Sequence, residues 1–170
     1  WDDMRLTIDL LLGMINDMLD VYQESYSGLP LLTSTVSVKG LVADVVQLFR
    51  SEAAAKRITF HLEMPEDDVA MTADRRRLLR VLINLVHNAL KFSPQGGTIT
   101  VTVHAEARGS TGRESRGTSS SQATIQVADE GPGIASEDLP HLFEMFFRKK
   151  DPGDIRIGRG LGLHFCRLVV

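Results

Sequence analysis

The sequence predicts an α+β fold, because segments with helical and with strand periodicity occur in the same chain. Several segments repeat apolar residues at helical spacing, others alternate apolar and polar residues, and glycine- or proline-bearing stretches separate them. The chain has 170 residues, of which 43% are hydrophobic and 24% charged. This composition is ordinary for a globular protein, and the length corresponds to one domain with an appended segment.

The charge, the cysteine content and the lack of long apolar runs argue against several classes of protein. The 19 basic and 22 acidic residues give a net charge of −3, which provides no basic field for nucleic acid. A single cysteine, Cys166, excludes an internal disulfide and is typical of a reducing compartment. No apolar run approaches the roughly 18 to 20 residues that a membrane span needs, and Asp2 and Asp3 argue against a signal peptide. We therefore expect a cytoplasmic segment that contacts neither membrane nor nucleic acid.

The first predicted element is a helix over residues 1–27 with an apolar seam. The seam residues follow the 4-3-4-3-4 spacing of a coiled coil or bundle helix: Met4, Ile8, Leu11, Ile15, Met18 and Tyr22. Leaving six such side chains in water would forgo roughly 9 kcal/mol. The seam therefore needs either the core of its own domain or a second helix. Gly28 and Pro30 end this helix and begin a linker over residues 28–36.

A second helix is predicted from about Ser37 to Lys56, followed by strands at 58–63 and 69–72. The helix places four apolar residues on one face: Leu41, Val45, Leu48 and Phe49. A third helix begins at the N-cap Asp74 and ends at about Phe92, before Ser93 and Pro94.

The remaining elements are a hairpin and a last helix. Strands at 98–105 and 124–128 flank a Ser-, Gly- and Arg-rich loop over residues 108–122. The strand at 98–105 alternates Ile99, Val101 and Val103, which predicts one buried face. A final apolar helix starts at Leu161.

The third helix carries a polar stripe opposite its apolar face. At 100° per residue the stripe contains Arg77, Arg80, Asn84, Asn88 and Lys91. Amide oxygens can bind hard cations, and a lysine supplies a point charge for phosphate. A solvated helix face remains the alternative explanation of the stripe.

Two glycine-bearing loops suggest ligand contacts. Asp129 follows a strand and precedes Gly131 and Gly133, which suits an amine-bearing ring but also an ordinary turn. The run Gly158–Leu163 enters the last helix, where backbone N–H groups can hold phosphate. This run is neither a P-loop nor a dinucleotide fingerprint.

The order of these motifs resembles the ATP-binding domain of sensor histidine kinases, in the GHKL superfamily. Residues 84–92 correspond to the N box, 129–134 to the G1 box, 142–148 to the F box and 158–163 to the G2 box. Residues 1–27 look like the second helix of the dimerisation and phosphoacceptor hairpin.

The resemblance implies a fold, an activity and partners. The fold would be a Bergerat-type two-layer α/β sandwich over residues 37–170, with a mixed sheet packed by helices, a protruding bundle helix and missing C-terminal strands. The domain would bind Mg-ATP and transfer the γ-phosphoryl group to a histidine on the hairpin, for relay to a response regulator. The full protein would form a homodimer through its hairpins.

The resemblance also implies site residues. Asn84 and Lys91 would act in catalysis, Asn88 would coordinate Mg²⁺, and Asp129 would accept a hydrogen bond from the adenine amino group. The nucleotide contacts would be Asn84, Asn88, Lys91, Phe92, Asp129, Gly131, Gly133, Ile134, Phe146, Arg148, Gly158, Gly160, Leu161 and Gly162.

Two alternatives stay open from the sequence. An ATP hydrolase of the same superfold would carry a glutamate where this chain has Asn84, and a non-catalytic nucleotide-binding module would lack an acceptor. None of the five histidines lies in the acceptor setting of the family: His61, His87, His104, His141 and His164. We therefore expect the acceptor to lie outside this chain.

Overall fold

The computed structural model describes residues 31–107, 121–147 and 160–170. The helix predicted over 1–27 and most of the predicted hairpin loop lie outside these residues. The described chain divides into two compact units, residues 31–133 and residues 134–170, and each is treated by itself.

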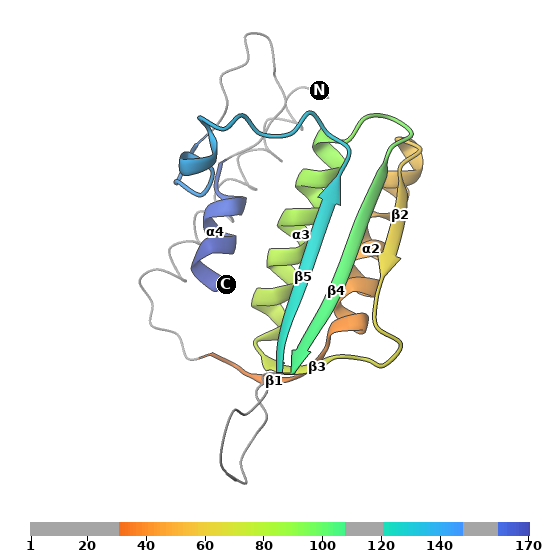
Figure 1. Cartoon of the computed structure of the whole chain (residues 1–170), viewed down its shortest axis with the longest axis vertical. Coiled ribbons are helices and arrows are strands. Elements are labelled where there is room, and N and C mark those ends of the chain that lie inside the picture. Colours follow the sequence, from red (N-terminus) through yellow and green to blue (C-terminus); the bar gives the residue numbers. More distant parts are fainter. Residues whose placement is uncertain (1–30, 108–120, 148–159) are drawn as a thin grey trace, which may run out of the picture. The chain divides into compact units, whose positions relative to one another are not determined.

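The unit over residues 31–133 is a layer of helices on a mixed sheet (Figure 1). Its elements are β1 (Ser34–Ser37), α2 (Val38–Ala55), β2 (Thr59–Glu63), β3 (Ala70–Ala73), α3 (Arg75–Phe92), β4 (Thr98–Ala107) and β5 (Ser121–Asp129). The main sheet has the order β2-β4-β5, with β2 parallel and β5 antiparallel to β4. Helices α2 and α3 both cover one face of this sheet, which confirms the predicted α+β fold.

The core lies between that layer of helices and the sheet. Ile99, Val101 and Val103 of β4 are all buried, as their alternation predicts. From β5, Ile125 and Val127 pack against the same cluster.

Helix α2 has the N-cap that its sequence predicts, and most of its predicted apolar face is buried. The hydroxyl of Ser37 accepts a hydrogen bond from the Gly40 N–H at 2.9 Å and caps the helix. Leu41 and Val45 are buried, but Leu48 is 61% exposed, so the apolar face predicted for this helix is only partly buried. The buried face centres near Phe49, and Leu48 lies about 100° around the helix from it.

Strand β1 is an element that the sequence does not predict, since residues 28–36 read as a linker. It pairs antiparallel with β3, with Ser34 opposite Ala73 and Ser37 opposite Ala70. Only Val36 of its four residues is buried. A strand with one buried side chain has too little alternation to be recognised from the sequence.

The unit over residues 134–170 contains two described helices. They are the short 3-10 helix η1 (Leu139–His141) and α4 (Gly162–Val169). Helix α4 confirms the predicted last helix, and its Phe165 and Cys166 are buried. Among all described helices, none is long and apolar enough to cross a membrane.

Candidate functional site

Helix α3 holds the predicted polar stripe in the expected orientation. Asp74 caps its start, accepting hydrogen bonds from the N–H groups of Arg76 at 3.0 Å and Arg77 at 3.3 Å. Leu82, Val86, Ala89 and Leu90 are buried on the core side. Asn84 and Asn88 are half-buried, and within the described residues no hydrogen bond of either side chain is found. Within this part of the chain their amide oxygens are therefore available to a ligand.

The carboxylate of Asp74 is stabilised by this arrangement. Its burial alone would raise the pKa, but the N–H groups of Arg77, Leu32 and Arg76 together hold the pKa below its usual value. The Leu32 N–H lies 3.3 Å from Asp74 Oδ2, so the carboxylate also ties the chain before β1 to the start of α3.

The other end of α3 presents a cation and an aromatic ring. The Lys91 ammonium lies 4.6 Å from the centroid of the Phe92 ring, a cation–π geometry. Phe92 is 43% exposed although it ends a helix of the core layer. Lys91 lies one turn beyond Asn88 on the same helix, and Phe92 follows it directly.

The loop after β5 packs onto this end of α3. A Cβ on Gly131 would lie 3.0 Å from the Phe92 carbonyl oxygen and 2.5 Å from Asp129 Oδ1, so only glycine allows the approach. Asp129 Oδ1 accepts a hydrogen bond from the Gly131 N–H at 2.8 Å, which fixes the carboxylate at the end of the strand. Asp129 itself is exposed. The structure thus brings the predicted N-box and G1-box residues together.

Gly133 and Ile134 continue this loop, on either side of the boundary between the two units. Gly133 has a positive φ of 72°, and a Cβ there would meet nothing within 4 Å. Gly133 therefore leaves open space beside the loop of the first unit. The side chain of Ile134 is exposed in the second unit.

The structure adds two residues that the sequence did not indicate. Glu130 Oε2 accepts a hydrogen bond from the Thr98 N–H at 3.0 Å and so joins the loop after β5 to the start of β4. Lys56 Nζ donates to the Leu90 carbonyl at 2.7 Å, in the last turn of α3. For Lys56 a signal existed, because Pro94 has no N–H for that carbonyl.

In the second unit, the predicted F-box and G2-box residues also adjoin. The Phe146 N–H donates to the Gly160 carbonyl at 2.9 Å. Gly160 has a φ of 66°, and a Cβ on it would lie 2.7 Å from the Phe146 carbonyl carbon. Leu161 is buried and Gly162 begins α4. Arg148 and Gly158 lie outside the described residues.

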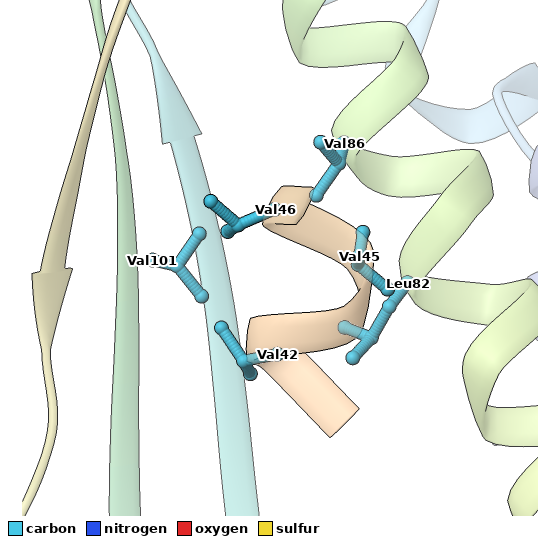
Figure 2. A pocket seen from close by; sticks show the side chains of 6 residues that line it. All are labelled: Val42, Val45, Val46, Leu82, Val86 and Val101. Atoms are coloured by element: carbon cyan, nitrogen blue, oxygen red, sulfur yellow. The ribbon is translucent and has the colours of Figure 1, made fainter. Parts of the chain in front are cut away.

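A pocket in the core of the first unit does not compete with this site. Figure 2 shows its lining, which consists only of aliphatic side chains from α2, α3 and β4: Val42, Val45, Val46, Leu82, Val86 and Val101. Such a lining offers no polar group to orient a nucleotide. We interpret the space as imperfect packing between the helices and the sheet.

The comparison with protein families decides the class of the chain. Residues 73–170, more than half of the sequence, match the family described as "Histidine kinase-, DNA gyrase B-, and HSP90-like ATPase". The chain belongs to this family. Its matched region begins just before α3 and includes all four boxes.

Within this ATPase family, the chain is similar to sensor proteins and histidine kinases. The sensor protein KdpD of Clostridium acetobutylicum is 29% identical over 161 residues, which are 94% of this chain and 16% of that protein. The histidine protein kinase DivJ of Caulobacter vibrioides is 32% identical over 157 residues, 92% of this chain and 24% of that protein. The chain thus spans less than a quarter of these two relatives.

Solved structures agree with the fold. Full-length ShkA in complex with AMPPNP superposes with a TM-score of 0.77 at 25% identity, covering 99% of this chain and 32% of that one. The catalytic domain of the histidine kinase ThkA superposes at 0.59 and 26% identity, covering 83% of this chain and 80% of that domain. The predicted resemblance to a histidine kinase ATP-binding domain is therefore confirmed.

Proposed function

We propose that this chain is the part of a sensor histidine kinase that binds Mg-ATP and supplies the γ-phosphoryl group to a histidine on a dimerisation hairpin. The observation that carries the proposal is the contact of Gly131 with the Phe92 carbonyl, because it joins the N-box helix to the loop of Asp129. A base-recognising carboxylate and two amide side chains then belong to one unit of the fold.

The described residues fit an adenine nucleotide. Asp129 is exposed, and one of its oxygens is held by the Gly131 N–H, so the carboxylate is oriented before a ligand arrives. In our proposal it accepts a hydrogen bond from the adenine amino group. Gly131 lets the loop of Asp129 pack on the Phe92 carbonyl, Gly133 faces open space, and Phe92 is exposed at the end of α3. Ile134, exposed in the second unit, is proposed as a further contact.

Contacts with the phosphates and Mg²⁺ are proposed for the polar residues of α3. The Asn88 amide oxygen is proposed as the metal ligand with Asn84 beside it, and Lys91 as a phosphate contact. A bound Mg²⁺ supplies neutralisation of phosphate charge. The remaining proposed contacts belong to the F and G2 boxes: Phe146, Arg148, Gly158, Gly160, Leu161 and Gly162.

In our proposal, residues 1–27 are the second helix of the phosphoacceptor hairpin, and the linker ends before β1. The catalytic domain then begins with β1 rather than at residue 37, because β1 pairs with β3 and its Val36 is buried in the core. The full protein would dimerise through the hairpin, act in the cytoplasm and relay phosphate to a response regulator. The family's usual place for a hydrolytic glutamate holds Asn84 here, which supports transfer over ATP hydrolysis.

Phosphoryl transfer in trans tests this proposal. The chain is incubated with γ-labelled ATP and Mg²⁺, with and without a separate hairpin that carries an acceptor histidine. We expect acid-labile label on the added hairpin and none on the chain itself, because transfer requires the nucleophile in line at about 3 to 3.5 Å. Label mapped to a histidine of this chain, or Mg-ATP binding without transfer, would contradict the proposal.

A further inference from the structure

The last turn of α3 contains a carbonyl group that its own helix cannot satisfy. In a continued helix, the Leu90 carbonyl would accept a hydrogen bond from the N–H of residue 94. Residue 94 is a proline and has no N–H. One position earlier the pattern is intact, because the Ser93 N–H donates to the Ala89 carbonyl at 2.9 Å. Leu90 is fully buried, so its carbonyl needs a partner within the protein.

Lys56 supplies this partner from the end of α2. Its ammonium donates to the Leu90 carbonyl at 2.7 Å, although the two residues are 34 positions apart. The carbonyl of Lys56 accepts a hydrogen bond from the Gly96 N–H at 3.0 Å. One residue therefore fastens both the last turn of α3 and the loop that follows it. A cation is also favourable at a helix C-terminus, where the helix dipole is negative.

The segment that Lys56 holds is the one that carries the proposed nucleotide contacts. Lys91 and Phe92 follow Leu90 directly, and the Phe92 carbonyl packs on Gly131 beside Asp129. A shift of this last turn would displace the phosphate-binding lysine and the adenine-binding loop together.

We propose that Lys56 is a positioning residue of the nucleotide site. It acts through the Leu90 carbonyl and sets the position of Lys91 and of the Gly131 loop. This inference rests on the proposed function. The ion pair of Lys56 with Glu52, at 3.9 Å between side chains that are 39% and 42% exposed, contributes little, because solvent screens it.

Matched variants separate positioning from general stability. Lys56→Met removes the donor and Lys56→Arg retains a cation with N–H groups. Lys39→Met is the control, because Lys39 stands at the other end of α2 and also donates to a backbone carbonyl, that of Glu66. Glu52→Gln removes only the ion pair.

The readouts are the Kd for a non-hydrolysable ATP analogue with Mg²⁺, below the unfolding transition, and backbone amide shifts without nucleotide. For Lys56→Met we expect roughly three- to tenfold weaker binding and shifted amides at 89–93, 95–97 and Gly131. Lys56→Arg should retain most of the affinity. Lys39→Met and Glu52→Gln should stay within about twofold of the parent chain, with those amides unmoved.

The outcomes distinguish the inference from the function on which it rests. If the parent chain does not bind the analogue, the proposed function fails. If the parent chain binds and Lys56→Met binds equally well, or loses no more than Lys39→Met, Lys56 is not a positioning residue. If Lys56→Met does not fold, Lys56→Ser, whose polar side chain is too short to replace the ammonium at the Leu90 carbonyl, is judged by the same criteria.

Discussion

An aspartate lies at each end of helix α3, in the unit over residues 31–133, and the two differ in burial and in hydrogen bonding. At the start, Asp74 is buried and accepts hydrogen bonds from three backbone N–H groups, including that of the distant Leu32. At the other end, Asp129 is exposed and accepts one from Gly131. A buried carboxylate that accepts several backbone hydrogen bonds stabilises the fold. An exposed carboxylate held by one backbone hydrogen bond can also bind a ligand.

The residues around the two ends of α3 differ in the same way: those at the start bind other parts of the fold, and those at the other end are exposed. At the start of α3, Asp74 accepts a hydrogen bond from the Leu32 N–H before β1, and Arg75 forms an exposed ion pair with Asp44 of α2 that adds little. At the other end, the glycine-bearing loop after β5 packs on the Phe92 carbonyl, and the Phe92 side chain is exposed. Variants at the two ends should therefore separate stability from nucleotide affinity.

Nucleotide affinity should depend more strongly on Asp129 than on any other residue tested. Asp129→Ala should weaken adenine nucleotide binding roughly ten- to a hundredfold, because it removes one charge-assisted hydrogen bond. The thermal unfolding midpoint should be nearly unchanged, since the side chain is exposed. Calorimetric titration beside a thermal scan checks both, and unchanged affinity would remove Asp129 from the site.

The second effect is on stability, at Asp74. Asp74→Ala should lower the free energy of unfolding by about 2 kcal/mol, because it removes the N-cap and the bond to Leu32. Nucleotide affinity measured on the folded fraction should remain within a few-fold of the parent chain. Urea unfolding measures the loss, and a destabilisation below about 0.5 kcal/mol, the scatter of ordinary surface substitutions, would break the proposed contrast between the two ends.

A smaller effect is expected at Asn88, and it should depend on the metal. Asn88→Ala should weaken ATP binding several-fold with Mg²⁺ and little with EDTA, because alanine offers no oxygen to the cation. Titrations in both buffers provide the test. Equal losses with and without Mg²⁺ would show that Asn88 is not a metal ligand.

The smallest effect is the pH dependence of Asp74. Its folded-state pKa lies below the usual 3.8, so its ionisation stabilises the fold above that pH, and the contribution disappears as the pH falls through the folded-state value. An asparagine side chain can also cap a helix, so Asp74→Asn isolates the charge. The difference in unfolding free energy between the two chains should be constant near neutral pH and shrink below about pH 4. A constant difference down to about pH 2 would contradict this assignment.

The sequence predicted α3 almost completely because its signals are local. A capping aspartate, a repeated apolar face and a proline after Ser93 determine its start, orientation and end. The alternation in β4 was equally informative. The exposure of Leu48 was missed because helical spacing gives the apolar face only to within about one residue's rotation.

The sequence could not reveal the contacts between distant side chains and backbone groups. Lys56 reaches a carbonyl 34 positions away, and Glu130 reaches the Thr98 N–H across 32 positions. Pro94 marks the Leu90 carbonyl as lacking its helical donor, but only the fold determines which side chain reaches it. The N-box and G1-box residues were recognised as motifs, whereas their junction at Gly131 and Phe92 required the structure.

The proposed nucleotide site is tested by titrating the chain with a non-hydrolysable ATP analogue, with Mg²⁺ and with EDTA, beside a GTP analogue. We expect saturable binding of the adenine nucleotide that Mg²⁺ strengthens, and much weaker binding of the guanine nucleotide, which has no amino group at the position that Asp129 would recognise. Absence of binding in Mg²⁺ by a chain shown to be folded, or equal affinity for both bases, would contradict the proposed site.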